Sequence, residues 1–251
     1  MLKQHMKTLF FISFILFLLA ACSNETSDST ESENQNDNDS TTNEENVDNE
    51  EEELDTELNI AYSAQPPTLD PHFTTAVATS DIMRGVFETL VTVDADYNFQ
   101  PMLADTYEIS EDGKSITFQL REGVLFHNGK EMKAEDVVAS MERWRDISNR
   151  ADAFRESTFE AQDEYTVVMT LPDPISTTLS VLTWMVGSYA AIMPKEAIEG
   201  ATDTGVEEYI GTGPFQFEEW KQDAYVKLSK FDDYQPRSEE DPRGAVGRPR
   251  G

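Results

Sequence analysis

Residues 23–57 set the strongest limit on where this chain can fold. This segment contains fifteen Asp or Glu residues, no Lys or Arg, and almost no apolar side chains. Such a composition cannot bury enough apolar surface to offset the entropy that folding costs, and its like charges repel one another. We therefore predict that residues 22–57 form a disordered acidic tether and that a folded unit begins at Leu58.

The segment before the tether has the pattern of an export signal. Two lysines precede an apolar run from Leu9 to Ala21, which is shorter than the roughly 20 residues that a membrane-spanning helix needs. The run Leu19-Ala20-Ala21-Cys22 resembles the lipobox of bacterial lipoproteins, in which the cysteine receives a diacylglyceryl group. Two acyl chains give a stable membrane anchor. We predict a signal peptide over residues 1–21 and lipidation at Cys22; an ordinary signal peptide or an uncleaved anchor is the alternative.

The charge of the chain limits its partners. The formal net charge is −30, and much of it lies in the tether. Nucleic-acid binding needs clustered Lys and Arg, so this balance argues against it, and it also argues against adhesion to an anionic membrane surface. The one cysteine forms no internal disulfide and is too few for a zinc site built on several thiolates. We expect a monomer without a cofactor.

Local signals in residues 58–235 indicate both helices and strands. Asp112-Gly113 separates two β-rich runs as a hairpin turn does, and Asn128-Gly129 marks a second tight turn. Ala134-Glu135-Asp136 places acids in the first turn of a helix, where the helix dipole favours them. The remaining expected elements are a strand at 58–62, a helix at 79–94 with Thr79 or Ser80 as N-cap, a strand at 165–171, a helix at 177–187 and a hairpin after residue 214.

The run Gly211-Thr212-Gly213-Pro214 is not a phosphate-binding loop. It lacks the Gly-Lys-Ser/Thr ending of such loops, and Pro214 has no backbone N–H to donate. The elements together predict an α/β fold (α+β, with a mixed sheet) rather than regular βαβ repetition.

Three motifs in this region resemble one protein family. They are "PPTLDPH", "EDGKSITFQLREGVLFHNGKEMKAEDVVASMERW" and "GTGPFQFEEWKQDAYVKLSKFDDY". In this order they closely resemble the solute-binding proteins of the oligopeptide, dipeptide and nickel ABC importers, extracellular solute-binding protein family 5. The resemblance covers about residues 58–235. It implies part of the first lobe of a two-lobe, type II periplasmic-binding-protein-like fold, in which the lobes close on a ligand by hinge motion.

The resemblance also implies a function. A lipid-anchored receptor on the extracytoplasmic face of the cell membrane would capture short peptides and deliver them to the permease subunits of an ABC importer. A nickel chelate or another small solute, such as a sugar or haem, is the alternative ligand within the same family. Members of the family are roughly twice as long as this chain. We therefore expect a fragment without its second lobe, ending in an irregular tail over residues 236–251.

Two segments are candidate ligand-binding walls. The resemblance implies that the loop after the proline-rich segment lines the cleft; its residues are Phe73, Thr74, Thr75, Ala76, Val77, Ala78 and Thr79. The second wall is predicted from aromatic and small residues, which suit a pocket; its residues are Trp184, Met185, Gly187, Ser188 and Tyr189. A capping loop and a buried core are the plain structural alternatives for the two segments.

Metal binding and catalysis receive little support from the sequence. His72 stands beside a proline and His127 lies in the turn region of the second motif, so we interpret both as structural and expect no metal site. No nucleophile elbow, HExxH motif or supported Ser-His-Asp order is present. We therefore predict a binding protein rather than an enzyme. A surface hydrolase, a chaperone-like or sensing lipoprotein, and a truncated remnant that binds nothing are the more distant alternatives.

Overall fold

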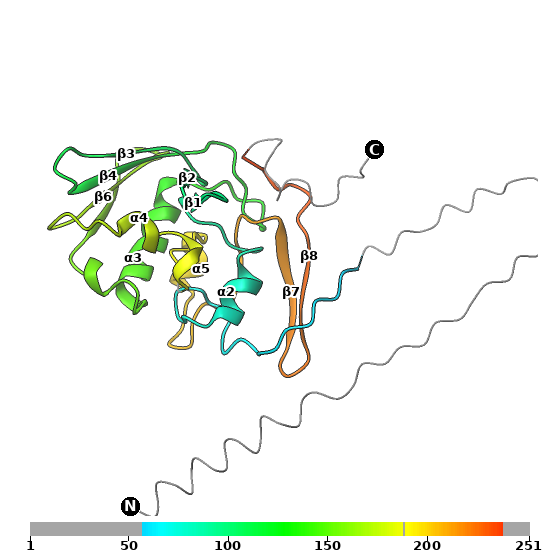
Figure 1. Ribbon diagram of the computed structural model, residues 1–251. Helices are drawn as coiled ribbons and strands as arrows, with labels where there is room; N and C mark the ends of the chain where they lie inside the picture. The colour runs from blue at the N-terminus through cyan, green and yellow to red at the C-terminus, as the bar shows by residue number, and fades with distance from the viewer. Residues whose placement is uncertain (1–56, 188, 238–251) are drawn as a thin grey trace, which may run out of the picture. The chain divides into compact units, whose positions relative to one another are not determined.

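The computed structural model describes residues 57–187 and 189–237. The predicted signal peptide, Cys22, nearly all of the tether and most of the tail lie outside the described residues. The chain divides into two units, residues 1–57 and a unit that begins at Leu58. Figure 1 shows this unit with a β-sheet that includes residues 104–120 on one side, a β-hairpin of residues 215–230 on the other, and helices between them.

The described elements follow one another as short strands and helices. The α-helices are α2 (Val77–Met83), α3 (Ala134–Ile147), α4 (Thr178–Val181) and α5 (Lys195–Glu199), and the 3-10 helices are η1 (Asp152–Phe154) and η2 (Trp184–Val186). The strands are β1 (Val91–Val93), β2 (Phe99–Pro101), β3 (Ala104–Ile109), β4 (Ser115–Leu120), β5 (Thr158–Ala161), β6 (Thr166–Thr170), β7 (Phe215–Lys221) and β8 (Tyr225–Lys230). The strands β1, β2 and β5 were not expected from the sequence.

The largest sheet has the strand order β3-β4-β6-β5, and every neighbouring pair is antiparallel. The predicted hairpin turn at Asp112-Gly113 joins β3 to β4, and Gly113 has the positive φ of 69° that such a turn needs. Alternate residues of β4 are buried, as expected for a sheet with one face on the core. The strand predicted at 165–171 is confirmed as β6.

Helix α3 begins where the sequence predicts and covers one face of this sheet. The carboxylate of Asp136 accepts hydrogen bonds from the backbone N–H groups of Lys133 and Lys195, at 3.0 and 2.8 Å. It thereby caps α3 and ties it to the start of α5. The apolar face of α3 packs in the main core, where Trp144 is fully buried.

The strand predicted at residues 58–62 is wrong. These residues form no strand, and none of the described strands pairs with them. Leu58 and Ile60 are 81% and 76% exposed. An apolar pattern gives a strand only where a neighbouring strand supplies hydrogen bonds and a core covers one face.

The helix predicted over residues 79–94 is wrong in both of its boundaries. α2 spans Val77–Met83, and its N-cap is Ala76. Thr79 and Ser80, expected as caps, lie inside the helix with buried side chains.

Tertiary hydrogen bonds explain the early end of α2. The carbonyls of Gly85 and Val86 accept hydrogen bonds from the backbone N–H groups of Phe215 and Gly213, at 3.0 and 2.9 Å. These carbonyls are therefore not available for a continuing helix. The β-branched run Val91–Val93 then forms β1.

A second core cluster lies between α2 and the β7–β8 hairpin, which the sequence predicted. Its buried members are Leu69, Met83, Val86, Phe87, Tyr189, Ala191, Met193 and Val206. The inward side chains of β7 and β8, Phe217 and Leu228 among them, pack against this cluster. The helix predicted at 177–187 is broken into α4 and η2. In the described part of the chain, no helix combines the length and apolarity needed to cross a membrane.

Candidate functional site

The first predicted wall spans a loop and the start of α2. Phe73 is 49% exposed and Val77 is 67% exposed, whereas the three residues between them are half-buried. Ala78 and Thr79 face the core, and the Thr79 hydroxyl donates to the carbonyl of Thr68 at 2.5 Å. Side-chain contact with a solute is therefore open to Phe73 and Val77 and closed to Ala78 and Thr79.

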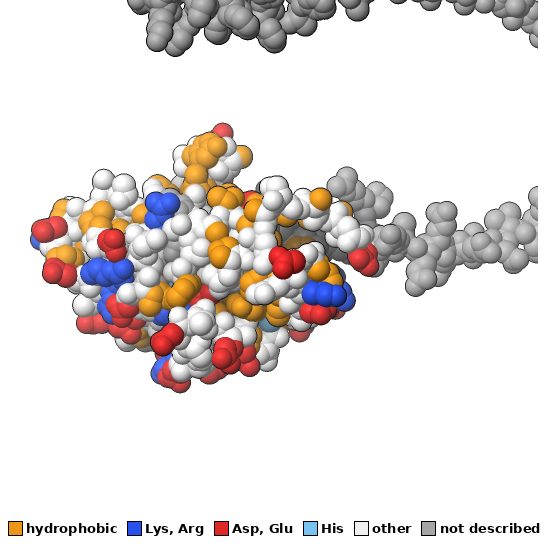
Figure 2. All heavy atoms as spheres, turned by 90° about the horizontal axis from the view of Figure 1, so that it is seen from below, with side chains coloured by type: hydrophobic (Ala, Val, Ile, Leu, Met, Phe, Trp, Pro, Cys, Tyr) orange, Lys and Arg blue, Asp and Glu red, His pale blue; other side chains and the backbone are white. Residues whose placement is uncertain are grey.

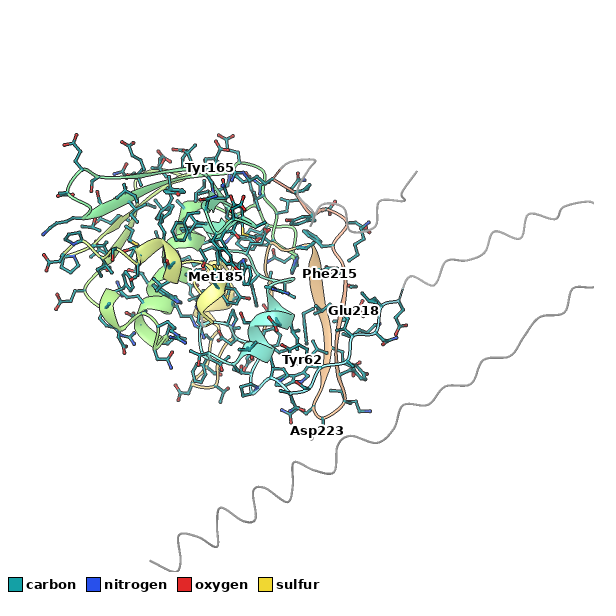
Figure 3. The ribbon with its side chains drawn as sticks, viewed as in Figure 1. Tyr62, Tyr165, Met185, Phe215, Glu218 and Asp223 are labelled. Atoms are coloured by element: carbon teal, nitrogen blue, oxygen red, sulfur yellow. The ribbon has the colours of Figure 1, made fainter. Side chains whose placement is uncertain are left out.

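The second predicted wall is η2 and the residues after it. Trp184 is half-buried, and its indole N–H donates to the hydroxyl of Thr92 at 3.3 Å. Met185 is 44% exposed, and Figure 3 shows it on the segment between α4 and α5. Tyr189 is fully buried, and its hydroxyl has no hydrogen-bond partner among the described residues. Ser188 lies outside the described residues.

The two walls touch at Thr75 and Gly187. A Cβ atom on Gly187 would lie 3.1 Å from the carbonyl oxygen of Thr75, which leaves almost no space for a side chain. Gly187 also has a φ of 62° and a ψ of 162°, a conformation that is essentially restricted to glycine. The sequence therefore identified two segments that the fold brings together, although 112 positions separate them. Which of their residues bind a solute stays a prediction.

A buried ionic network holds the segment that immediately precedes the first wall. Asp70 is fully buried and accepts hydrogen bonds from both terminal nitrogens of Arg143 on α3. The same carboxylate accepts from the backbone N–H groups of His72 and Val206, at 2.9 and 3.0 Å. One ion pair thus ties the "PPTLDPH" motif to α3 and to the loop before the β7–β8 hairpin. Gly205 leaves room for it, because a Cβ there would lie 2.9 Å from the carboxylate.

His72 completes the network as a neutral ring. Arg143 lies 3.1 Å from Nδ1 and can only donate, so the ring proton is on Nε2, which donates to the carbonyl of Ala191 at 2.8 Å. Burial, together with the charge of Arg143, lowers the pKa of His72 to about 4, against the opposing effect of Asp70. Burial is the largest single effect on Asp70 and acts to raise its pKa, but the hydrogen bonds and positive charges around the carboxylate, with the hydrogen bond from Arg143 first among them, together lower the pKa.

His127 has a comparable structural role at the "GTGP" run. Its Nε2 is 2.9 Å from the carbonyl of Gly213, and its Nδ1 accepts from the backbone N–H of Gly211 at 3.2 Å. Burial lowers the pKa of His127. Both rings therefore use both nitrogens within the protein, and the described residues contain no group of three metal-ligating side chains.

Arg84 belongs to this region, although the sequence reasoning did not select it. It is the C-cap residue of α2, it is exposed, and its guanidinium carbon lies 5.2 Å from the centre of the Trp184 ring. No sequence signal marks this contact, because 100 positions separate the two residues. On the face that Figure 2 shows, Lys and Arg side chains form small separate groups among Asp and Glu.

A large part of the folded segment matches the model of a known protein family. Residues 98–245 match the model of the bacterial extracellular solute-binding proteins, family 5, middle region. The match covers more than half of the chain. The chain belongs to this family.

Curated relatives of this family 5 protein include glutathione-binding proteins. GsiB of Escherichia coli O1:K1 is 29% identical over 182 residues, which cover 71% of this chain and 35% of GsiB. The chain therefore spans about a third of the length of the curated relatives it matches.

Solved structures of other binding proteins resemble this family 5 protein. NikA of Brucella suis in complex with Fe(III)-EDTA is 28% identical with a TM-score of 0.62, and the match covers 70% of this chain and 36% of NikA. The oligopeptide-binding protein AppA of Bacillus subtilis, in complex with a nonapeptide, is 26% identical with a TM-score of 0.59, covering 68% and 35%. These matches confirm the predicted fold class, part of a lobe of a type II periplasmic-binding-protein fold.

Proposed function

We propose that this protein is the solute-binding receptor of an ABC importer and that it captures short peptides for a membrane permease. Membership of family 5 supports a binding role rather than catalysis. Two similar proteins, GsiB and AppA, are described as binding glutathione and oligopeptides. Attachment at Cys22 through a lipid, with the acidic tether between the membrane and the lobe, completes the proposal.

The contact between the two walls is the observation that carries the proposal. The backbone of Thr75 packs against Gly187, and the exposed apolar side chains of Phe73, Val77 and Met185 belong to these same segments. Exposed backbone groups and small hydroxylated residues suit a ligand whose own backbone must be recognised, because they bind any peptide sequence. Apolar side chains beside them suit variable peptide side chains.

A chelated metal is the alternative solute. The likeness to NikA in complex with Fe(III)-EDTA favours it. Direct ligation by His72 or His127 is disfavoured, because both rings use their nitrogens in internal hydrogen bonds. A chelate would therefore have to be held through its organic ligand.

Isothermal titration calorimetry tests the peptide proposal. Di- to pentapeptides and a nickel chelate are titrated into a form of the protein that contains both lobes. We expect peptide binding that Met185→Ser weakens, whereas Ile147→Ser on α3 has no effect. Ile147 is a matched control because it is 40% exposed, against 44% for Met185. Tight binding of the chelate without binding of any peptide would contradict the proposal.

A further inference from the structure

Arg84 lies at the border of the two walls. It follows the last residue of α2, which begins within the first wall, and its guanidinium lies over the ring of Trp184 of the second wall. The separation of 5.2 Å is within the roughly 6 Å over which a cation and an aromatic face attract. Trp184 is itself fixed by its hydrogen bond to Thr92. The position of the charge is therefore defined before any ligand arrives.

The charge of Arg84 has no acidic partner in the described part of the chain. None of the ion pairs found there, at N–O distances up to 4.0 Å, includes Arg84. Asp81, one helical turn earlier, accepts a hydrogen bond from the hydroxyl of Tyr62 instead. The chain has a formal net charge of −30, so an added carboxylate meets overall repulsion and needs a local cation such as Arg84.

The contact with Trp184 leaves the guanidinium N–H groups of Arg84 able to donate hydrogen bonds to a ligand. A guanidinium carries its N–H groups in its own plane, where two of them match the two oxygens of a carboxylate. Such a bidentate pair is stronger than a hydrogen bond to a neutral acceptor. The contact with Trp184 already restricts the Arg84 side chain, so binding costs less side-chain entropy.

We propose that Arg84, held over the ring of Trp184, binds a carboxylate of the solute. The inference rests on the proposed peptide-receptor function and narrows it to solutes with a free carboxylate, such as a peptide with an unblocked C-terminus. Phe73, Val77 and Met185 would then contact the apolar part of the same solute.

A paired-ligand titration tests this proposal. Trialanine and trialanine amide differ only at the C-terminal carboxylate, and neither has a charged side chain. Each is titrated into a ¹⁵N-labelled form of the protein that contains both lobes, and binding is followed by the indole N–H signal of Trp184, which Trp184→Phe identifies. We expect the acid to bind about fivefold or more tightly than the amide, as a charge-assisted hydrogen bond implies. In Arg84→Gln this preference disappears, and in Arg84→Lys it is reduced.

One control variant separates the possible outcomes. Arg150→Gln removes one exposed positive charge elsewhere and should leave the preference intact, which separates a local contact from the effect of net charge. A preference for the acid that persists in Arg84→Gln, or its absence in the unsubstituted protein, overturns the role of Arg84 and leaves the receptor function standing. A failure of both ligands to bind the unsubstituted protein overturns the receptor function and this inference together.

Discussion

The guanidinium of Arg143 donates hydrogen bonds to both carboxylate oxygens of Asp70, although 73 positions separate the two residues. Asp70 is fully buried, and the Arg143 side chain is 9% exposed. The pair ties the segment before the first wall to α3, the longest described helix. Its integrity should therefore decide whether the candidate site forms.

Asp70→Asn should lower the free energy of unfolding by about 3 kcal/mol, because it leaves the charge of Arg143 buried without its counter-ion. Chemical denaturation of the full chain measures the change. Asp173→Asn is the matched control: it breaks an ion pair whose side chains are 44% and 86% exposed, and it should cost less than about 1 kcal/mol. Equal effects of the two substitutions would contradict the structural role of Asp70.

Acidification should destabilise the folded unit between about pH 6.5 and pH 4. Burial lowers the pKa of His72 to about 4, so the unfolded chain takes up this proton at a higher pH than the folded chain does. The contribution of His72 to stability is complete above pH 6.5 and declines as the pH falls toward 4, by up to about 3 kcal/mol. Burial lowers the pKa of His127 and acts in the same direction.

Denaturation midpoints measured from pH 7.5 to pH 4 check this dependence. His72→Gln should reduce the overall stability and flatten the pH profile, because the titrating group is gone. An unchanged slope in His72→Gln would show that other groups control the acid sensitivity.

Gly211→Ala should destabilise the protein by roughly 1–3 kcal/mol through overpacking. A Cβ at this position would lie 2.1 Å from the carbonyl oxygen of Val86, and a backbone atom cannot move aside as a side chain can. Gly200→Ala is the control, since its Cβ would lie 3.4 Å from the nearest atom. Thermal unfolding compares the two; similar midpoints would mean that the "GTGP" run does not need glycine for close packing.

Gly187→Ala should reduce the magnitude of the free energy of solute binding by more than it lowers the free energy of unfolding. The added Cβ would press on the carbonyl of Thr75 and separate the two walls. Gly123→Ala also adds a Cβ at a positive φ, 73°, but in open space, and it should leave affinity unchanged. Calorimetry and thermal unfolding of both variants give the comparison. Unchanged affinity in Gly187→Ala would remove this contact from the site.

Cys22→Ser should abolish lipid attachment. We expect the unsubstituted protein to incorporate labelled palmitate and to sediment with membranes in a bacterium that processes lipoproteins, and the variant to do neither. The unfolding temperature of the folded unit should be the same in both, because residue 22 precedes that unit. Membrane sedimentation with label retained in the variant would contradict lipidation at this cysteine.

The sequence by itself determined the elements whose signals are local. The turns at Asp112-Gly113 and Asn128-Gly129, the start of α3 at Ala134 and the β7–β8 hairpin each depend on a few consecutive residues, and the structure has all of them. The two walls of the candidate site were also predicted, the first through the family resemblance and the second from its aromatic and small residues. These features are readable because turn chemistry and hydrophobic periodicity are properties of neighbouring residues.

Only the tertiary structure decided how distant segments meet. It ended α2 at Met83, left residues 58–62 without a sheet, and joined Thr75 to Gly187, Asp70 to Arg143 and Arg84 to Trp184. Close backbone approach and the pairing of buried charges depend on side chains roughly 70 or more positions away. Because no local pattern encodes those neighbours, the sequence indicated the segments of the candidate site, and the fold determined which of their side chains are exposed.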